Sequence, residues 1–175
     1  MLKSQFVIGL EADVKSQSTV PRIPLTWIAL LRIMLGLVFL TTWYSNLHKG
    51  FYTATGLQNF FTNVFPQAHN PLTWYAAFIV KVILPVRALF APFQLVAELV
   101  MGLALLVGAF TPLFSLAAIL FLLNTYLATF GVDWPWSYLM PMGILAVCGL
   151  TRAGRALGVD ALLLQRFGDK TWPVW

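Results

Sequence analysis

Two charged side chains stand inside long apolar stretches of this sequence: Arg32 precedes Gly36, and Glu98 precedes Gly102, in each case by four residues. A helix repeats every 3.6 residues, so each charge and its glycine lie one turn apart on the same face. A charge in the hydrocarbon of a membrane costs at least ~2.5–3.5 kcal/mol, which favours pairing of opposite charges. If the two helices are antiparallel, Arg32 comes level with Gly102 and Glu98 with Gly36. We therefore expect Arg32 and Glu98 to form a buried ion pair, with the two glycines allowing close helix packing.

A third polar side chain, Asn124, belongs to the same expected cluster. At about 1.5 Å rise per residue, Arg32 lies about 10 Å, Asn124 about 15 Å and Glu98 about 18 Å deep, whereas Lys49 is about 18 Å from Glu98 in height and too far away to be its first partner. The cluster has two interpretations. It is either a clasp that fixes the register between helices, or a site that binds a polar head group or relays protons.

The composition is that of an integral membrane protein. Of the 175 residues, 59% are hydrophobic and 10% are charged, whereas soluble domains contain about a quarter of charged residues. The apolar runs occupy most of the chain, so one membrane domain is expected over residues 1–175. The net charge of +5 comes from basic residues beside the apolar segments, a pattern of membrane topology that implies a lipid bilayer and no nucleic acid as partner.

Four apolar segments predict transmembrane helices, at about 25–47, 93–110, 114–130 and 137–150. Residues 48–92 form a long connection, whose second part is apolar but interrupted by Lys81, Pro85 and Arg87. We expect this connection to lie at the interface or to be re-entrant, with a fifth span as the alternative. The expected fold is an all-α integral membrane protein, a four-helix transmembrane bundle with a long interfacial connection between its first two helices.

Four spans bring the two tails, 1–22 and 151–175, to the same side of the membrane. Seven basic residues lie in these tails and three in the opposite loops. The positive-inside rule then places both termini in the cytoplasm, for a multi-pass protein of a prokaryotic inner membrane. A fifth span would break this agreement.

The sequence gives little indication of a metal site or a disulfide. Cys148 is the only cysteine, which excludes an internal disulfide and a cysteine cage. His48 and His69 lack a second pair at ligand spacing, so no metal is expected. Most of the aromatic residues fit membrane belts and lipid contact. A surface that stacks on a quinone would draw on these aromatic candidates: Phe60, Phe61, Trp74, Trp134 and Trp136.

Four sequence features follow one another along the chain: Leu31-Arg32-x-x-x-Gly36-x-x-Phe39, then Lys49, then Glu98-Leu-x-x-Gly102-Leu-x-Leu-Leu-x-Gly108-x-x-Thr111, and finally Gly154-Arg155-x-Leu-Gly158-x-Asp160. In this order and spacing they resemble the DoxX/DoxD superfamily of small four-helix membrane proteins. The resemblance covers residues 25 to 166. Trp134-Pro-Trp-Ser-Tyr138, before the last predicted span, is closer to the DoxD branch.

The best-described DoxD protein is the membrane subunit of a thiosulfate:quinone oxidoreductase, which acts with a second small subunit. The resemblance implies a similar role, in which a quinone head group meets Arg32, Glu98 and Asn124 while a partner subunit handles the sulfur substrate. A partner is required, because the chain has one cysteine and no evident redox centre. The alternative is a non-catalytic accessory subunit of a larger respiratory or photosynthetic complex, in which the polar cluster only holds the helices in shape.

Overall fold

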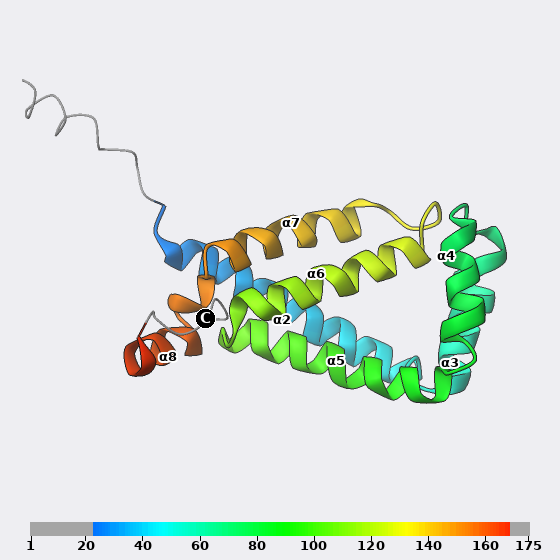
Figure 1. Cartoon of the computed structure of the whole chain (residues 1–175), viewed down its shortest axis with the longest axis horizontal. Helices are drawn as coiled ribbons and strands as arrows, with labels where there is room; N and C mark the ends of the chain where they lie inside the picture. The colour runs from blue at the N-terminus through cyan, green and yellow to red at the C-terminus, as the bar shows by residue number, and fades with distance from the viewer. Residues whose placement is uncertain (1–22, 169–175) are drawn as a thin grey trace, which may run out of the picture.

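The computed structural model describes residues 23–168, and all the regular secondary structure in that range is helical. Figure 1 shows four long helices that lie side by side and alternate in direction. They are α2 (Leu25–His48), α5 (Arg87–Val107), α6 (Thr111–Ala128) and α7 (Trp136–Leu150). The expected all-α bundle is confirmed.

Short helical segments close both ends of the bundle (Figure 1). The segments between α2 and α5 lie across one end, the cap end: α3 (Ala54–Asn59), η1 (Phe60–Val64), η2 (Gln67–His69), α4 (Thr73–Phe78) and η3 (Ile79–Ile83). At the other end, the terminal end, the described chain begins and ends. The segments there are η4 (Ala153–Arg155) and α8 (Val159–Phe167).

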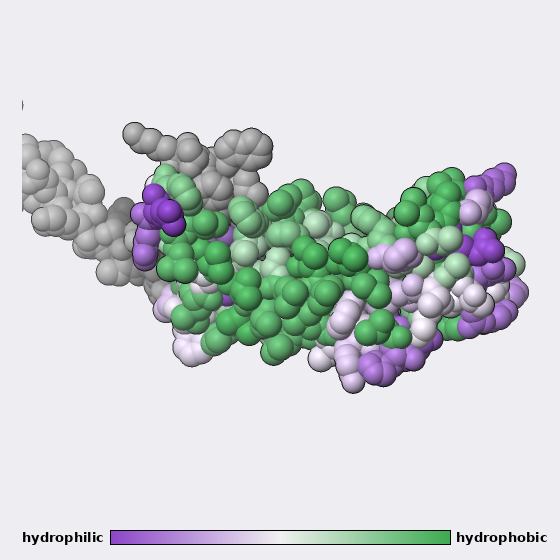
Figure 2. All heavy atoms as spheres, turned by 90° about the horizontal axis from the view of Figure 1, so that it is seen from below, coloured by the Kyte–Doolittle hydropathy of each residue, from purple (hydrophilic) through white to green (hydrophobic). Residues whose placement is uncertain are grey.

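The bundle has the surface of a membrane protein. By length and composition, α2, α5 and α6 can each cross a membrane, and α7 is apolar but shorter. Figure 2 shows apolar residues over the middle of the visible face and hydrophilic residues towards its two ends. This distribution matches a hydrocarbon layer about 30 Å thick between two polar interfaces.

Among the described residues, the cap contains no helix long enough to count as a membrane span by length and composition. Its apolar rod Thr73–Ile83 is about 16 Å long, about half the thickness of the hydrocarbon. Polar side chains attach the cap to the end of α6, where helix carbonyls lack intrahelical partners. The amide of Gln67 donates to the Ala128 carbonyl at 3.1 Å, and that of Asn70 to the Leu127 carbonyl at 2.9 Å.

The second long helix begins earlier than its sequence indicates. We expected it to start at 93, but α5 starts at Arg87, directly after a turn that contains Pro85. Pro92 lies inside α5. It is close enough to the helix start that its ring and missing N–H disturb only the first two turns.

Two glycines set the distance between α2 and α5. A Cβ atom at Gly36 would lie 2.6 Å from the Leu106 nitrogen, and one at Gly102 would lie 2.8 Å from Leu40 Cδ2. Neither position has room for a larger side chain. Gly36 is therefore level with Leu106, and not with Glu98 as we expected.

Candidate functional site

Arg32 is fully buried at the terminal end of the bundle. Its Nη1 donates to the Leu105 carbonyl and its Nη2 to the Leu157 carbonyl, both at 2.9 Å. A Cβ at Gly108, where φ is +69°, would lie 2.0 Å from Nη1, so glycine leaves the guanidinium its place. The C-terminus of α5 carries the negative end of a helix dipole, which stabilises the positive charge.

Asp160 brings a negative charge to the turn between α5 and α6, where it acts on the positive charge of Arg32. It is fully buried, and its two carboxylate oxygens accept from the backbone N–H groups of Phe110 at 2.6 Å and Thr111 at 2.9 Å. These N–H groups lie at the start of α6, where the helix dipole favours a negative charge. The charges of Asp160 and Arg32 also attract each other. We call Arg32, Gly108, Thr111 and Asp160 the polar clasp.

The expected ion pair between Arg32 and Glu98 is therefore wrong. Glu98 lies seven residues, or about 10 Å, from Leu105 along α5, on the side of the cap end. Because Gly36 is level with Leu106, Glu98 is level with Tyr44 of α2. The two charges end up in different parts of the bundle, each with its own partners.

Glu98 is buried, with 3% of its surface exposed. Its carboxylate accepts a short hydrogen bond from the hydroxyl of Tyr52 and a second one, at 3.2 Å, from the amide of Gln94. Tyr52 lies in the connection after α2. Burial and the hydrogen bond to Glu98 raise the pKa of its hydroxyl far above the ordinary value. Tyr52 is therefore a neutral donor to Glu98 at physiological pH.

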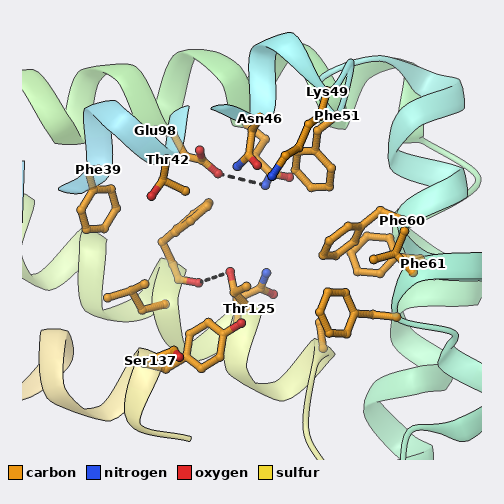
Figure 3. A pocket seen from close by; sticks show the side chains of 18 of the residues that line it. Phe39, Thr42, Asn46, Lys49, Phe51, Phe60, Phe61, Glu98, Thr125 and Ser137 are labelled. Carbon is orange, nitrogen blue, oxygen red and sulfur yellow. Dashed lines mark hydrogen bonds between the residues drawn. The ribbon is translucent and has the colours of Figure 1, made fainter. Parts of the chain in front are cut away.

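A cavity of about 560 Å³ lies between the four long helices and the cap, within the range of small-molecule sites. Figure 3 shows Glu98, Thr42 and Asn46 on one side of it and Thr125 and Ser137 on the other. The polar side chains that line it come from α2, α3, α5, α6, α7 and the α2–α3 connection: Thr42, Asn46, Lys49, Asn59, Gln94, Glu98, Asn124, Thr125, Ser137 and Tyr138.

Aliphatic side chains and seven phenylalanine rings form the rest of the cavity wall, the rings being Phe39, Phe51, Phe60, Phe61, Phe65, Phe90 and Phe121. Near the cap they pack against one another, with ring centroids 4.8 Å apart for Phe51 and Phe60 and 5.0 Å apart for Phe60 and Phe65. Two of the five aromatic candidates from the sequence, Phe60 and Phe61, thus line the cavity. The other three do not line it and are mostly exposed: Trp74 at 64%, Trp134 at 73% and Trp136 at 65%.

The three polar residues of the expected cluster divide between two places. Glu98 and Asn124 line the cavity from α5 and α6, and the Asn124 side chain also accepts a hydrogen bond from Tyr75. Burial raises the pKa of Tyr75, which lies in the cap, to about 12, so it too acts as a donor. Arg32 does not line the cavity and belongs to the polar clasp.

Several cavity residues escaped the sequence analysis. Gln94 could have been found, because it precedes Glu98 by one helix turn on the same face. Lys49 was judged too far from Glu98, because the depths were counted from residues 25 and 110 as if these two helix ends were level. Nothing in the sequence pointed to Tyr52, whose hydroxyl reaches Glu98 from a connecting segment.

The family model described as DoxX matches residues 27–132. No curated protein and no solved structure gives a match. The matched range contains α2, the cap, α5 and α6, and so it includes Arg32 and most residues of the cavity wall. It covers more than half of the chain, which therefore belongs to the DoxX family.

Proposed function

We propose that this protein is the membrane subunit of a quinone-linked oxidoreductase and that its cavity holds the quinone head group. One observation carries the proposal. A cavity walled by phenylalanine rings, inside a membrane bundle, contains a buried carboxylate with a tyrosine donor. This combination of aromatic surface and few placed polar groups is typical of sites for flat, weakly polar ligands.

The two sides of the cavity suit the two ends of such a head group. A quinone ring carries two oxygens on opposite edges, and reduction to the quinol adds two electrons and two protons. In this proposal Glu98, which accepts hydrogen bonds from Tyr52 and Gln94, lies towards one oxygen, and Asn124 and Thr125 of α6 lie towards the other. Figure 3 shows Glu98 and Thr125 on opposite sides of the cavity. Glu98 then passes a proton to the ring, Asn124 and Thr125 hydrogen-bond the opposite oxygen, whose proton comes from water, and the two electrons come from a partner subunit. Thiosulfate is the electron donor that the DoxD resemblance implies.

We further propose that the terminal end faces the cytoplasm of a prokaryotic cell and the cap end faces the opposite side. Arg152, Arg155 and Arg166 lie at the terminal end, and Lys49, Lys81 and Arg87 at the cap end. The basic residues of the two tails, including those outside the described residues, add to the first group. The cap is then the surface on which a partner subunit delivers electrons to the cavity.

Membranes that contain the protein and its partner should reduce a quinone analogue with thiosulfate. In Glu98→Gln, which retains the shape of the side chain, we expect turnover to fall at least about 100-fold, the usual scale for a lost proton-transfer group. The amount of folded protein should not change. Arg166→Gln is the matched control, since it removes an exposed charge at the terminal end, away from both the cavity wall and the cap.

Unaltered turnover in Glu98→Gln would contradict the role of the cavity. Purification in mild detergent tests the whole proposal. Isolation with one small subunit supports it, whereas a stoichiometric place in a large assembly without quinone turnover would indicate the non-catalytic accessory role.

A further inference from the structure

Some residues of the cavity wall are also exposed on the surface of the protein. Their positions show where the cavity opens. Val38 lines the cavity although it is 46% exposed. Thr42, one turn further along α2, and Ser137, in the first turn of α7, are exposed lining residues as well. The cavity therefore opens sideways between α2 and α7. Lys49 and the α3–η1 residues Asn59 and Val64 extend the opening towards the cap.

The length of α7 explains this opening. Near the terminal end the two helices touch, with Cys148 Sγ 3.8 Å from the Ile28 carbonyl oxygen. The helices are antiparallel (Figure 1), so Ser137, eleven residues earlier on α7, comes level with Phe39, eleven residues later on α2. Trp136, the first residue of α7, is then level with Leu40, so α7 begins too late to cover the last eight residues of α2.

The opening lies at the depth of the lipid chains. Val38 and Thr42 precede the end of α2 at His48 by about 15 Å and 9 Å. The surface beside them is apolar, with Leu37 of α2 50% exposed and Leu139 of α7 44% exposed. A molecule that enters between Val38 and Ser137 therefore comes from the bilayer and not from water.

We propose that the ligand of the cavity enters from the bilayer between α2 and α7 and keeps an apolar chain in this opening. The inference rests on the proposed function and narrows its substrate class to quinones with a long apolar tail. The polar head lies beside Glu98, where the buried hydrogen-bonding groups are. The tail extends past Val38 and Ser137 into the lipid. The gradient along α2, from Val38 through Thr42 to Asn46, matches a molecule that is apolar at one end and polar at the other.

Binding to the full protein in lipid nanodiscs tests the opening, with ubiquinone-0 as the head group alone and decylubiquinone as the head with a tail. By calorimetry, decylubiquinone should bind with an apparent affinity at least about tenfold higher, because its tail concentrates it in the bilayer from which the opening is entered. Val38→Trp and Ser137→Trp should each weaken decylubiquinone binding about tenfold and leave ubiquinone-0 within about twofold. Leu37→Trp and Leu139→Trp are matched controls, since these neighbours are equally exposed but do not line the cavity.

The outcomes separate the two proposals. Equal affinity for both quinones, or equal losses in Val38→Trp and Leu37→Trp, would overturn the lateral opening and leave the quinone site in place. If the unaltered protein binds neither quinone, the proposed function is wrong, and mass spectrometry of the protein in mild detergent then decides about the opening. A retained lipid that Val38→Trp loses and Leu37→Trp keeps supports it, and any other result overturns it.

Discussion

The polar clasp and the cavity each contain a charged side chain that the sequence places inside an apolar helix. The two charges differ in the groups that bind them. In the clasp, Arg32 and Asp160 are bound by backbone groups at the ends of α5 and α6 and by each other's charge. In the cavity, Glu98 has side-chain donors and lies beside open space. A charge bound by helix ends holds the fold together, whereas one that faces a cavity is available to a ligand.

The comparison separates the two interpretations of the intramembrane charges. We propose the clasp interpretation for Arg32, whose partners are carbonyls of the chain itself. We propose the site interpretation for Glu98 and Asn124, which line the cavity. Substitutions in the clasp should therefore affect folding more than substitutions in the cavity wall.

The largest effect is expected from Asp160→Ala. The change removes the acceptor of two N–H groups at the start of α6 and leaves the buried charge of Arg32 without its counter-charge. Loss of one partner of a buried charge pair costs about 3–5 kcal/mol. Thermal unfolding in detergent should show a much lower midpoint. Arg166→Ala, in an exposed part of the same helix, is the control and should change stability by less than about 0.5 kcal/mol.

A smaller loss is expected from Gly36→Ala. The added methyl group would meet the Leu106 backbone, so α2 and α5 must move apart, at a cost of about 1–3 kcal/mol. Gly143→Ala in α7 is the matched control. Nothing lies within 4 Å of its Cβ position, and alanine favours a helix by about 1 kcal/mol over glycine. Opposite shifts of the two unfolding midpoints would support the close contact, and equal shifts would contradict it.

The smallest effect on stability is expected in the cavity wall, for Tyr52→Phe. The loss of one hydrogen bond to Glu98 costs about 0.5–1.5 kcal/mol at neutral pH, because water in the cavity can replace the hydroxyl.

The same variant should change the dependence of stability on alkaline pH. The pKa of Tyr52 is raised in the folded protein. Above pH ~10 the unfolded chain loses the phenol proton and the folded chain keeps it, so stability falls as the pH rises. Tyr52→Phe should lose less stability than the unaltered protein between neutral pH and pH ~11, when unfolding midpoints are compared. Tyr44→Phe, which changes a largely exposed tyrosine, should follow the unaltered protein.

Much of the fold follows from local patterns. Apolar runs predict the long helices, and their length identifies a membrane bundle. The interruption at Pro85 indicates that the connection after α2 does not continue directly into α5. The spacing of Arg32 to Gly36 and Glu98 to Gly102 correctly marked the faces on which α2 and α5 touch, because charge, glycine and helix period are all local properties.

The partners of the charged residues could not be found in the same way. They depend on how far α2 and α5 are displaced along each other, which no local pattern records. Gly36 faces Leu106 and not Glu98, a difference of eight residues or about 12 Å along α5. That shift is enough to move Glu98 from Arg32 to Tyr52.

The sequence by itself determined that this protein is a bundle of membrane helices with buried charges on the contact faces, because hydrophobicity and helix period act along the chain. Only the tertiary structure decided that Arg32 meets the end of α5 and Leu157, near Asp160, and that Glu98 meets Tyr52 beside a cavity. These contacts join residues far apart in sequence. Their geometry depends on the helix register, which the packing of glycines against neighbouring backbone sets.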